Sequence, residues 1–350
     1  MLRIFALKIN ELFVDNPAPL AYIFLLSERR IPPHMVSSSP RLHLRPRKSL
    51  GQNFLRDDAV ARKIVASIDP RADDVLLEIG PGEGALTRHL APLTRRLSVV
   101  EIDARAAAGI RAMFPGGTVD VIEGDFLALD LDAFARDRGG RLRIAGNIPY
   151  NITTPILFHV IDHRAHVADL TILVQKEVGR RMGAAPGTPD YGILSVFCRY
   201  TSEVKALFEV PPGAFYPRPQ VTSLLMRLVM RAAPEVPAAD EAFFRMIVRA
   251  TFGKRRKTIR NSLRYVDALR GAALPDLPEL DRRPEELSVG ELVALSNTLL
   301  GAASFRAREG PGACPSAASR HASMRPTSSS SAFSSCSARS TWPSGSRAGG

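Results

Sequence analysis

The sequence predicts an α/β fold with a mostly parallel, doubly wound sheet, followed by a small all-helical domain. Two observations predict this arrangement. Between residues 74 and 145, short apolar runs alternate with helical patterns, as in repeated strand and helix units. Beyond residue 239, only helical patterns follow.

The apolar runs place the expected strands along the chain. The first four runs cover residues 74–80, 97–102, 119–122 and 142–145, and a glycine turn with a helical pattern follows the first. A last pair of strands is expected at 204–209 and 222–229. The helices of the second domain are expected near 240–252, 257–270 and 288–300.

These elements divide the chain into four parts. Residues 1–44 form an N-terminal extension, 45–231 the α/β domain, 232–300 the helical domain and 301–350 a tail rich in Ser and Arg. The apolar stretches of the extension are too short or too charged to span a membrane, and Met35 is a better initiator than Met1. The tail contains 14 Ser and few apolar residues, so we expect it to be disordered.

A glycine turn follows the first strand and indicates a bound ligand. Gly80, Gly82 and Gly84 let the backbone pass close to a small molecule at the carboxyl end of a parallel strand. A dinucleotide-binding turn has the spacing G-x-G-x-x-G, whereas this one has G-x-G-x-G. The spacing therefore argues against a pyrophosphate site.

Polar side chains follow the next three strands. Glu101 ends the second, where a carboxylate can accept hydrogen bonds from both ribose hydroxyls of a nucleoside. Asp125 and Phe126 follow the third, where they can meet the amine and the face of an adenine, and Asn147 follows the fourth. Any one of these acids is more often a solvated loop charge, but together they predict a nucleoside site.

The run Asn147-Ile148-Pro149-Tyr150 can hold a planar amine against a methyl donor. An exocyclic adenine amine is a poor nucleophile and needs orientation more than deprotonation. The Asn147 side-chain oxygen and the Ile148 carbonyl can accept its two hydrogens, while the base stacks on Tyr150. On these residues alone, a tight turn after a buried strand is an equally good interpretation.

With these motifs, the chain resembles the rRNA adenine N6,N6-dimethyltransferases, and most of all those of the bacterial small subunit. The resemblance covers about residues 45–300. It rests on ordered matches at 47–55, 78–84, 147–152, 175–178 and 209–215 with Pro217, Pro219 and Val221, and at 254–261. It implies a Rossmann-like, class I S-adenosylmethionine-dependent methyltransferase with a mostly parallel seven-stranded sheet, plus a small C-terminal all-helical domain that binds rRNA.

The resemblance also assigns residues to a site. The residues that it implies for S-adenosylmethionine are Asn53, Leu55, Gly80, Glu101, Asp125 and Asn147. It implies an adenine pocket of Asn147 and Tyr150, closed by Phe215 as a second stacking ring. Without the resemblance, a hydrophobic plug under a loop is an alternative interpretation of Phe215. After one transfer the pocket must tolerate a methyl group, and we expect the small Gly146 to help.

Two basic runs indicate a nucleic-acid partner. The formal charge of +12 lies partly in the tail, but residues 249–264 contain seven Lys or Arg and no acid, and residues 41–48 add four more. Such runs are often only solvated surface. Beside an adenine pocket they predict phosphate contacts from Arg47, Lys48, Lys254, Arg255, Arg256, Lys257 and Arg260.

No metal is expected. The seven histidines show no zinc-ligand spacing with Cys or acids, and His159 and His163 lack an evident third ligand. The three cysteines are too few for a disulfide framework, which favours a reducing cytosol.

Three functions are consistent with these patterns. The resemblance favours dimethylation of two adjacent adenines in a loop near the 3′ end of 16S rRNA, within the small ribosomal subunit or its precursor, by a cytoplasmic monomer. The first alternative is a 23S rRNA adenine methylase that confers macrolide resistance. The second is a non-catalytic small-subunit assembly factor, which the intact Asn147 and Tyr150 argue against.

Overall fold

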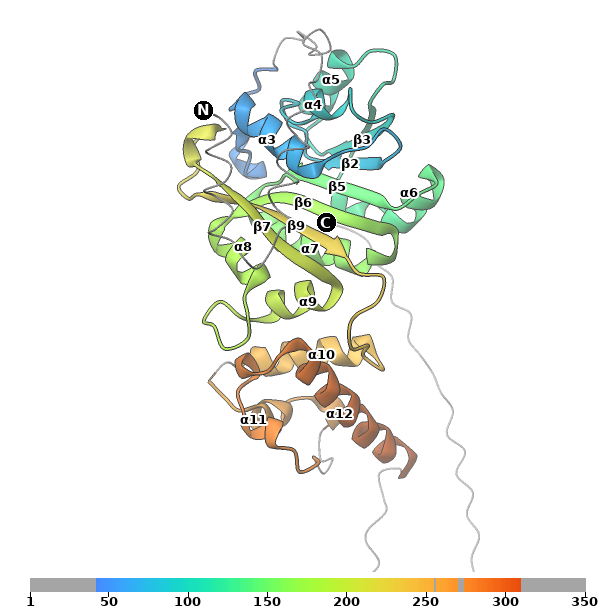
Figure 1. The fold of residues 1–350 in the computed structure, drawn as a ribbon, viewed down its shortest axis with the longest axis vertical. Coiled ribbons are helices and arrows are strands. Elements are labelled where there is room, and N and C mark those ends of the chain that lie inside the picture. The colour runs from blue at the N-terminus through green and yellow to red at the C-terminus, as the bar shows by residue number, and fades with distance from the viewer. Residues whose placement is uncertain (1–41, 255, 270–273, 310–350) are drawn as a thin grey trace, which may run out of the picture. The chain divides into compact units, whose positions relative to one another are not determined.

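A seven-stranded sheet is the centre of the protein (Figure 1). The computed structural model describes residues 42–254, 256–269 and 274–309. The strand order is β4-β3-β2-β5-β6-β9-β7, and only β9 runs antiparallel to its neighbours β6 and β7. The strands are β2 Val75–Ile79, β3 Arg96–Glu101, β4 Asp120–Glu123, β5 Leu142–Asn147, β6 Val167–Gln175, β7 Ser202–Val210 and β9 Ser223–Met230. The predicted α/β fold with a mostly parallel seven-stranded sheet is confirmed.

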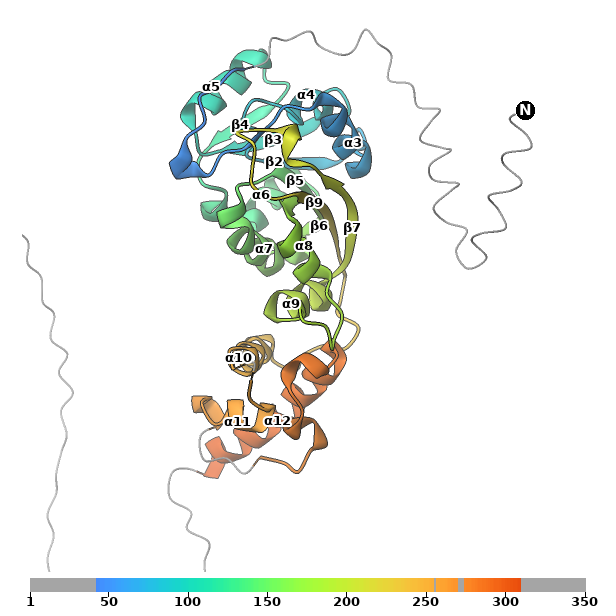
Figure 2. The ribbon, with the colours of Figure 1, turned by 90° about the vertical axis from the view of Figure 1, so that its left-hand side faces the viewer.

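Helices cover both faces of the sheet (Figure 2). One face carries α3 Asp58–Ile68, α4 Thr87–Leu90 and α5 Ala104–Met113, and the other carries α6 Leu131–Arg138, α7 Thr153–Asp162, α8 Lys176–Gly183 and α9 Ile193–Thr201. Strand β2 supplies both sides, because Leu76 packs with the first set while Leu77 and Ile79 pack with the second. A central parallel strand is therefore apolar at nearly every position.

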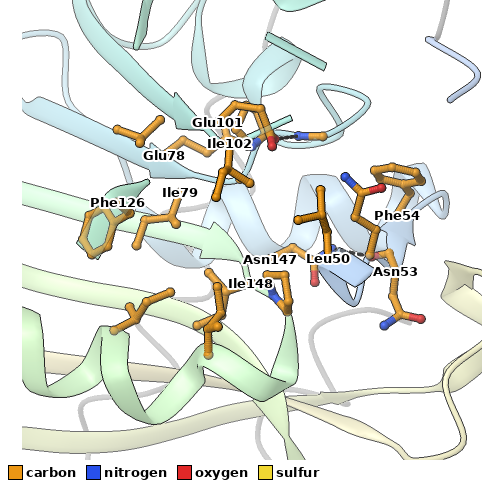
Figure 3. Close-up of a pocket in the computed structure, with 18 of the residues that line it drawn as sticks. Leu50, Asn53, Phe54, Glu78, Ile79, Glu101, Ile102, Phe126, Asn147 and Ile148 are labelled. Atoms are coloured by element: carbon orange, nitrogen blue, oxygen red, sulfur yellow. Dashed lines mark hydrogen bonds between the residues drawn. The ribbon is translucent and has the colours of Figure 1, made fainter. Parts of the chain in front are cut away.

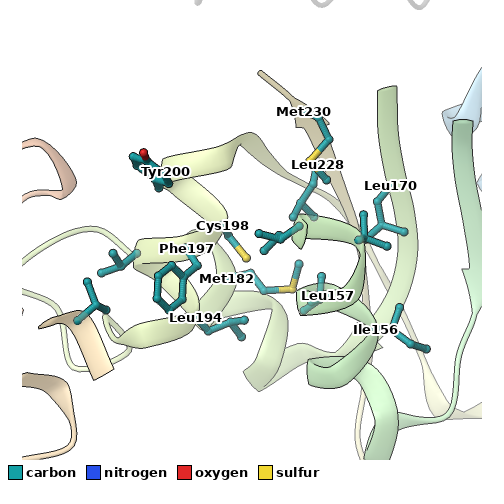
Figure 4. Close-up of a cluster of buried hydrophobic side chains, with 14 of the residues drawn as sticks. Ile156, Leu157, Leu170, Met182, Leu194, Phe197, Cys198, Tyr200, Leu228 and Met230 are labelled. Carbon is teal, nitrogen blue, oxygen red and sulfur yellow. The ribbon is translucent and has the colours of Figure 1, made fainter. Parts of the chain in front are cut away.

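The second hydrophobic layer continues into the C-terminal helices. Leu157, Met182, Phe197 and Cys198 interdigitate there with almost no exposure (Figure 4). The ring of Phe197 meets Phe244 of α10 (Glu241–Phe252) edge-on, with centroids 6.2 Å apart. Helices α10, α11 (Ile259–Leu263) and α12 (Val289–Glu309) belong to the same cluster as the sheet residues.

Two of the expected helices have different bounds. Of residues 257–269, the described part of the segment expected at 257–270, only α11 and a short 3-10 turn at Asp267–Leu269 are helical. Tyr265 and Val266 donate to carbonyls three residues back, which tightens the chain and turns Val266 into the core. Helix α12 continues to Glu309, past the expected end near 300, and Gly310 and Pro311 follow in the sequence.

An ion-pair network ties neighbouring strands together inside the sheet. The guanidinium of Arg143 on β5 lies 2.7 Å from Asp74 and 2.9 Å from Asp169 of β6, and Arg227 of β9 lies 2.5 Å from the same Asp169. Asp169 has 7% of its side chain exposed, so these bonds form largely out of water. The pairs fix the register of β5, β6 and β9.

Several predictions concern residues at the two ends of the chain that lie outside the described part. These are the start at Met35, the structure of residues 1–41, and the tail from 310 onward. Residues 42–44, expected to belong to the extension, are held to the domain, since the Leu44 amide donates to Glu83 at 2.9 Å. No helix in the described part of the chain is long and apolar enough to cross a membrane.

Candidate active site

A cavity of about 220 Å³ opens at the carboxyl ends of β2, β3 and β5 (Figure 3). Glu101 and Ile102 enter it from the end of β3, and Asn147 and Ile148 from the end of β5. The N-terminal segment closes the opposite side with Leu50, Asn53 and Phe54 (Figure 3). Parallel strands place their carboxyl ends at one edge, and this explains why residues so distant in sequence meet here.

The glycine turn forms one wall of the cavity. Gly80, Gly82 and Gly84 have φ angles of 62°, 55° and 76°, in the left-handed region that favours glycine. A Cβ on Gly82 would lie 2.9 Å from Cδ1 of Phe54. Phe54 belongs to β1 (Phe54–Leu55), which pairs with β8 (Phe215–Tyr216). The turn therefore needs glycine both for its backbone and for the ring that covers it.

Glu101 holds the shape of the cavity floor. Its Oε2 accepts the Gly82 amide at 3.0 Å and its Oε1 accepts the Asp103 amide at 2.9 Å. Only 4% of the residue is exposed, and burial raises the pKa of its carboxyl while the two amides oppose that rise. Each carboxylate oxygen retains a lone pair for a ligand donor.

All six residues expected to contact the methyl donor line this one cavity. Asn53, Leu55, Gly80, Glu101, Asp125 and Asn147 all belong to its lining. Asp125 is exposed and caps a 3-10 turn through the Leu127 amide at 2.9 Å, so one of its oxygens already has a partner. Their binding role stays a prediction, but their convergence is a fact of the fold.

Asn147 is held in one orientation by the N-terminal segment. Its Nδ2 donates to the Asn53 carbonyl at 2.9 Å, across 94 positions of the sequence. Asn53 is braced in turn by a bond of 3.2 Å from its own Nδ2 to the Gly51 carbonyl. With Nδ2 engaged, the Oδ1 of Asn147 is the atom left to accept a hydrogen from a ligand.

Tyr150 stands between the cavity and a second, more open hollow. Lys48, Gly51, Asn53, Tyr150, Asn151 and Gln175 line that hollow. The Tyr150 hydroxyl lies 2.7 Å from Oγ of Ser223, a fully buried residue of β9. This bond fixes the ring at the boundary of the two spaces, where one face can meet a flat ligand.

Two predictions about neighbouring residues need correction. Phe215 lines neither space, because its ring is 5% exposed and packs with Leu55, Val210 and Leu225 in the core. In this structure it is the hydrophobic plug. Gly146 does not line the cavity either, and a Cβ there would lie 2.6 Å from the Ile79 carbonyl. Close strand packing, and not room for a methyl group, accounts for that glycine.

Several lining residues were not predicted as site residues. Ile102 is 56% exposed and lines the cavity directly after Glu101. An apolar residue that directly follows an acid at a strand end is the sequence pattern that could have predicted it. Glu78 is fully buried beneath the glycine turn and accepts the Thr87 hydroxyl at 2.7 Å. Burial raises the pKa of its carboxyl to about 8, an effect that Thr87 opposes and Glu101 reinforces.

The predicted RNA-binding residues lie in two segments. Arg47 and Lys48 are exposed beside the hollow, with Arg47 3.6 Å from Asp103. Lys254, Arg256 and Lys257 are exposed and make no ion pair within the described residues. Arg260 differs, because it forms two bonds to Asp281 at 2.8 and 3.1 Å. Arg255 lies outside the described residues.

The expectation that His163 has no further ligand nearby is wrong. Asp130 and Asp132 of the α6 N-terminus bring their carboxylate oxygens within 4.8 Å of each other and of a His163 nitrogen. Asp132 also lies 2.9 Å from His166. The sequence did not predict that the N-terminus of α6 lies beside His163 at the end of α7, because spacing along the chain does not report contacts between separate helices.

Comparisons with known proteins identify the family of this chain. The family model described as Ribosomal RNA adenine dimethylase matches residues 43–273. A Ribosomal RNA small subunit methyltransferase A of Chromohalobacter salexigens is 45% identical over 267 residues, covering 75% of this chain and 94% of the relative. That of Geobacter metallireducens is 43% identical over 265 residues, covering 73% and 96%.

Solved structures give the same picture. A dimethyladenosine transferase from Plasmodium falciparum has a TM-score of 0.58 at 22% identity, covers 69% of this chain and 95% of that chain, and shares the fold. The 23S rRNA methyltransferase ErmE has a TM-score of 0.52 at 29% identity, with 69% and 100% covered. On the strength of the family match and these relatives, the chain belongs to the ribosomal RNA adenine dimethylase family.

Proposed function

We propose that this chain transfers methyl groups from S-adenosylmethionine to N6 of two adjacent adenines in a loop near the 3′ end of 16S rRNA. The product is N6,N6-dimethyladenosine, made during biogenesis of the small ribosomal subunit. The observation that carries the proposal is the fixed Asn147, whose Nδ2 is bonded to the Asn53 carbonyl and which lines the same cavity as every residue expected to hold the methyl donor.

The cavity suits a nucleoside with an attached amino acid. Glu101 offers buried carboxylate oxygens for the ribose hydroxyls, and Ile102 and Phe126 offer apolar surface to a flat base. Nothing lies within 4 Å of the place of the missing Cβ of Gly80, so a ligand has room to come close to the backbone there. When bound, S-adenosylmethionine supplies an electrophilic methyl group beside Asn147. No metal is required for this transfer.

The protein's part in the reaction is to orient the amine. Asn147 Oδ1 and the Ile148 carbonyl accept the two N6 hydrogens, which turns the nitrogen lone pair away from the ring. Tyr150 supplies a stacking face, and its bond to Ser223 holds that face in place. Alignment within a preformed pocket is a large source of rate enhancement, so few chemical groups are needed.

The small subunit is favoured as the substrate over 23S rRNA. Relatives named for the small subunit are 43–45% identical over almost their whole length, whereas the 23S enzyme ErmE is 29% identical. Exposed Lys and Arg at both basic segments fit an rRNA partner. We place the chain in the cytoplasm as a monomer, since one chain supplies every wall of the cavity.

The test is methyl transfer from labelled S-adenosylmethionine to small subunits and, separately, to large-subunit rRNA, both lacking the modification. Dimethyladenosine in 16S rRNA, found by nucleoside mass spectrometry, is the expected product. Asn147→Ala should lower the rate by about a hundredfold or more, because the amine loses its orienting acceptor. Unchanged thermal unfolding in that variant would exclude a folding defect.

Each alternative has its own outcome in the same experiment. Label confined to large-subunit rRNA would move the chain to the 23S methylases. Tight binding to small subunits without any label would leave a non-catalytic assembly factor.

A further inference from the structure

An exposed aromatic ring stands out among the C-terminal helices. Tyr265 is 70% exposed, the most exposed large apolar side chain in the described part of the protein. Leu263 and Val266 are buried, so they anchor the turn after α11 on both sides, while Arg264 and Tyr265 between them are exposed. A single exposed tyrosine is common in proteins, so only its surroundings can indicate a binding function.

The surroundings of Tyr265 are strongly basic. The ammonium of Lys254 lies 5.3 Å from the centre of the ring and over its face, within the range of a cation–π contact. Arg256, Lys257 and Arg264 are exposed, and like Lys254 they form no ion pair within the described residues. Exposed positive charge next to an open ring is the kind of surface that single-stranded RNA binds, and the nearest acid in the sequence is the exposed Asp267, two residues after Tyr265.

We propose that Tyr265 is a stacking platform for an unpaired rRNA base, with Lys254 and Lys257 holding the flanking phosphates. Lys254 lies over one face of the ring, which leaves the other face for a nucleobase. Stacking on a tyrosine tolerates any base, so this contact adds affinity and position without reading sequence. The proposal rests on the proposed function, because it takes the rRNA of the small subunit as the partner.

Substitution of the ring separates stacking from charge. Tyr265→Ala should weaken binding of the full chain to small subunits lacking the modification by about fivefold to a hundredfold. Tyr265→Phe is the matched control, because it keeps the stacking face, and it should bind as the wild type does. The dependence of affinity on salt should be unchanged in Tyr265→Ala, since no phosphate contact is lost. Equal binding by Tyr265→Ala and wild type would overturn the proposal.

A spectroscopic readout reports the stack directly. The chain has one tryptophan, Trp342, so a Tyr265→Trp, Trp342→Phe protein carries its only indole at the platform. A base that stacks there should quench the indole fluorescence on addition of subunits, and unchanged fluorescence at saturation would contradict the proposal. Wild-type methyl transfer is measured on the same subunits. If wild type methylates the subunits but Tyr265→Ala binds them as tightly as wild type does, only the stacking proposal is wrong. If wild type does not methylate them, the proposed function is wrong.

Discussion

The two buried acids Glu101 and Glu78, close to the glycine turn, have different hydrogen-bond partners. Glu101 uses both oxygens to accept backbone amides, which keeps the turn and the start of α5 in place. Glu78 has the Thr87 hydroxyl as its partner and lies deeper. The higher pKa of Glu78, about 8, means that its carboxyl is mostly neutral at physiological pH.

The raised pKa of Glu78 predicts a dependence of stability on pH. Unfolded, the carboxyl loses its proton near pH 4.5; folded, it keeps the proton to about pH 8. Between those values the native state binds more protons, so this group lowers the free energy of unfolding as pH rises, by on the order of 1 kcal/mol per pH unit at most. Glu78→Gln removes that loss.

Denaturant unfolding at pH 5.5, 7 and 8.5 checks this prediction. The stability of Glu78→Gln relative to wild type should rise across the series. Glu177→Gln, at an exposed carboxyl in the first turn of α8, is the control and should show no such trend. A constant difference between Glu78→Gln and wild type would show that the carboxyl ionises equally in both states.

Strand β9 supports the loop that carries Tyr150, although β6 separates β9 from β5, the strand that the loop follows. Ser223 begins β9, paired with Gln175 of β6 and Val210 of β7, and its hydroxyl reaches Tyr150. Two strands therefore fix the position of a side chain that belongs to neither of them. The ring proposed as a stacking face is therefore tied to a strand that has a neighbour on each side.

This connection predicts coupled effects of two substitutions. Tyr150→Phe and Ser223→Ala each remove the same bond, so each should raise the KM for small subunits by about threefold to tenfold, and the double variant should be no worse than either. The donor KM should be unchanged. Ser67→Ala on α3, whose hydroxyl donates to the Lys63 carbonyl, is the control. Multiplicative effects in the double variant would mean that the two groups act independently.

Across the molecule, the exposed basic residues differ in whether their charge is already paired in the free protein. Lys257 is exposed and makes no ion pair within the described residues, whereas Arg260 is held by Asp281. A lysine that meets a phosphate releases a counterion on binding, but an arginine already neutralised in the free protein releases less.

The two residues should therefore differ in a salt titration. Lys257→Ala should weaken binding to small subunits and lower the slope of log affinity against log salt by about 1. Arg260→Ala should change that slope less, because its charge is already offset. Filter binding between about 50 and 200 mM salt covers the useful range. Equal slopes for the two variants would show that Asp281 releases Arg260 to the RNA.

Local patterns predicted much of this molecule, and long-range contacts account for most of what they missed. The strand expected at 74–80 is β2 at 75–79, and its glycines have the positive φ angles that the turn requires. Gly80, Glu101, Asp125 and Asn147 meet in one cavity because parallel strands end together, and Asn53 and Leu55 join them from the N-terminal segment. The bond from Asn147 to Asn53, the burial of Phe215 and the early end of α11 depend on distant neighbours, which no local pattern records.

The ion pairs of Arg143, Asp169 and Arg227 have a consequence beyond the packing of the sheet. They cross β5, β6 and β9, where parallel pairing gives way to antiparallel, and a slip of one residue there would turn every side chain to the opposite face. Asn147 lies on β5, four residues after Arg143. We therefore expect the network to help align Asn147, the residue proposed to orient the adenine amine, from the other end of the same strand. Because the ionic atmosphere screens buried pairs far less than exposed ones, that alignment should survive at ionic strengths that detach the RNA.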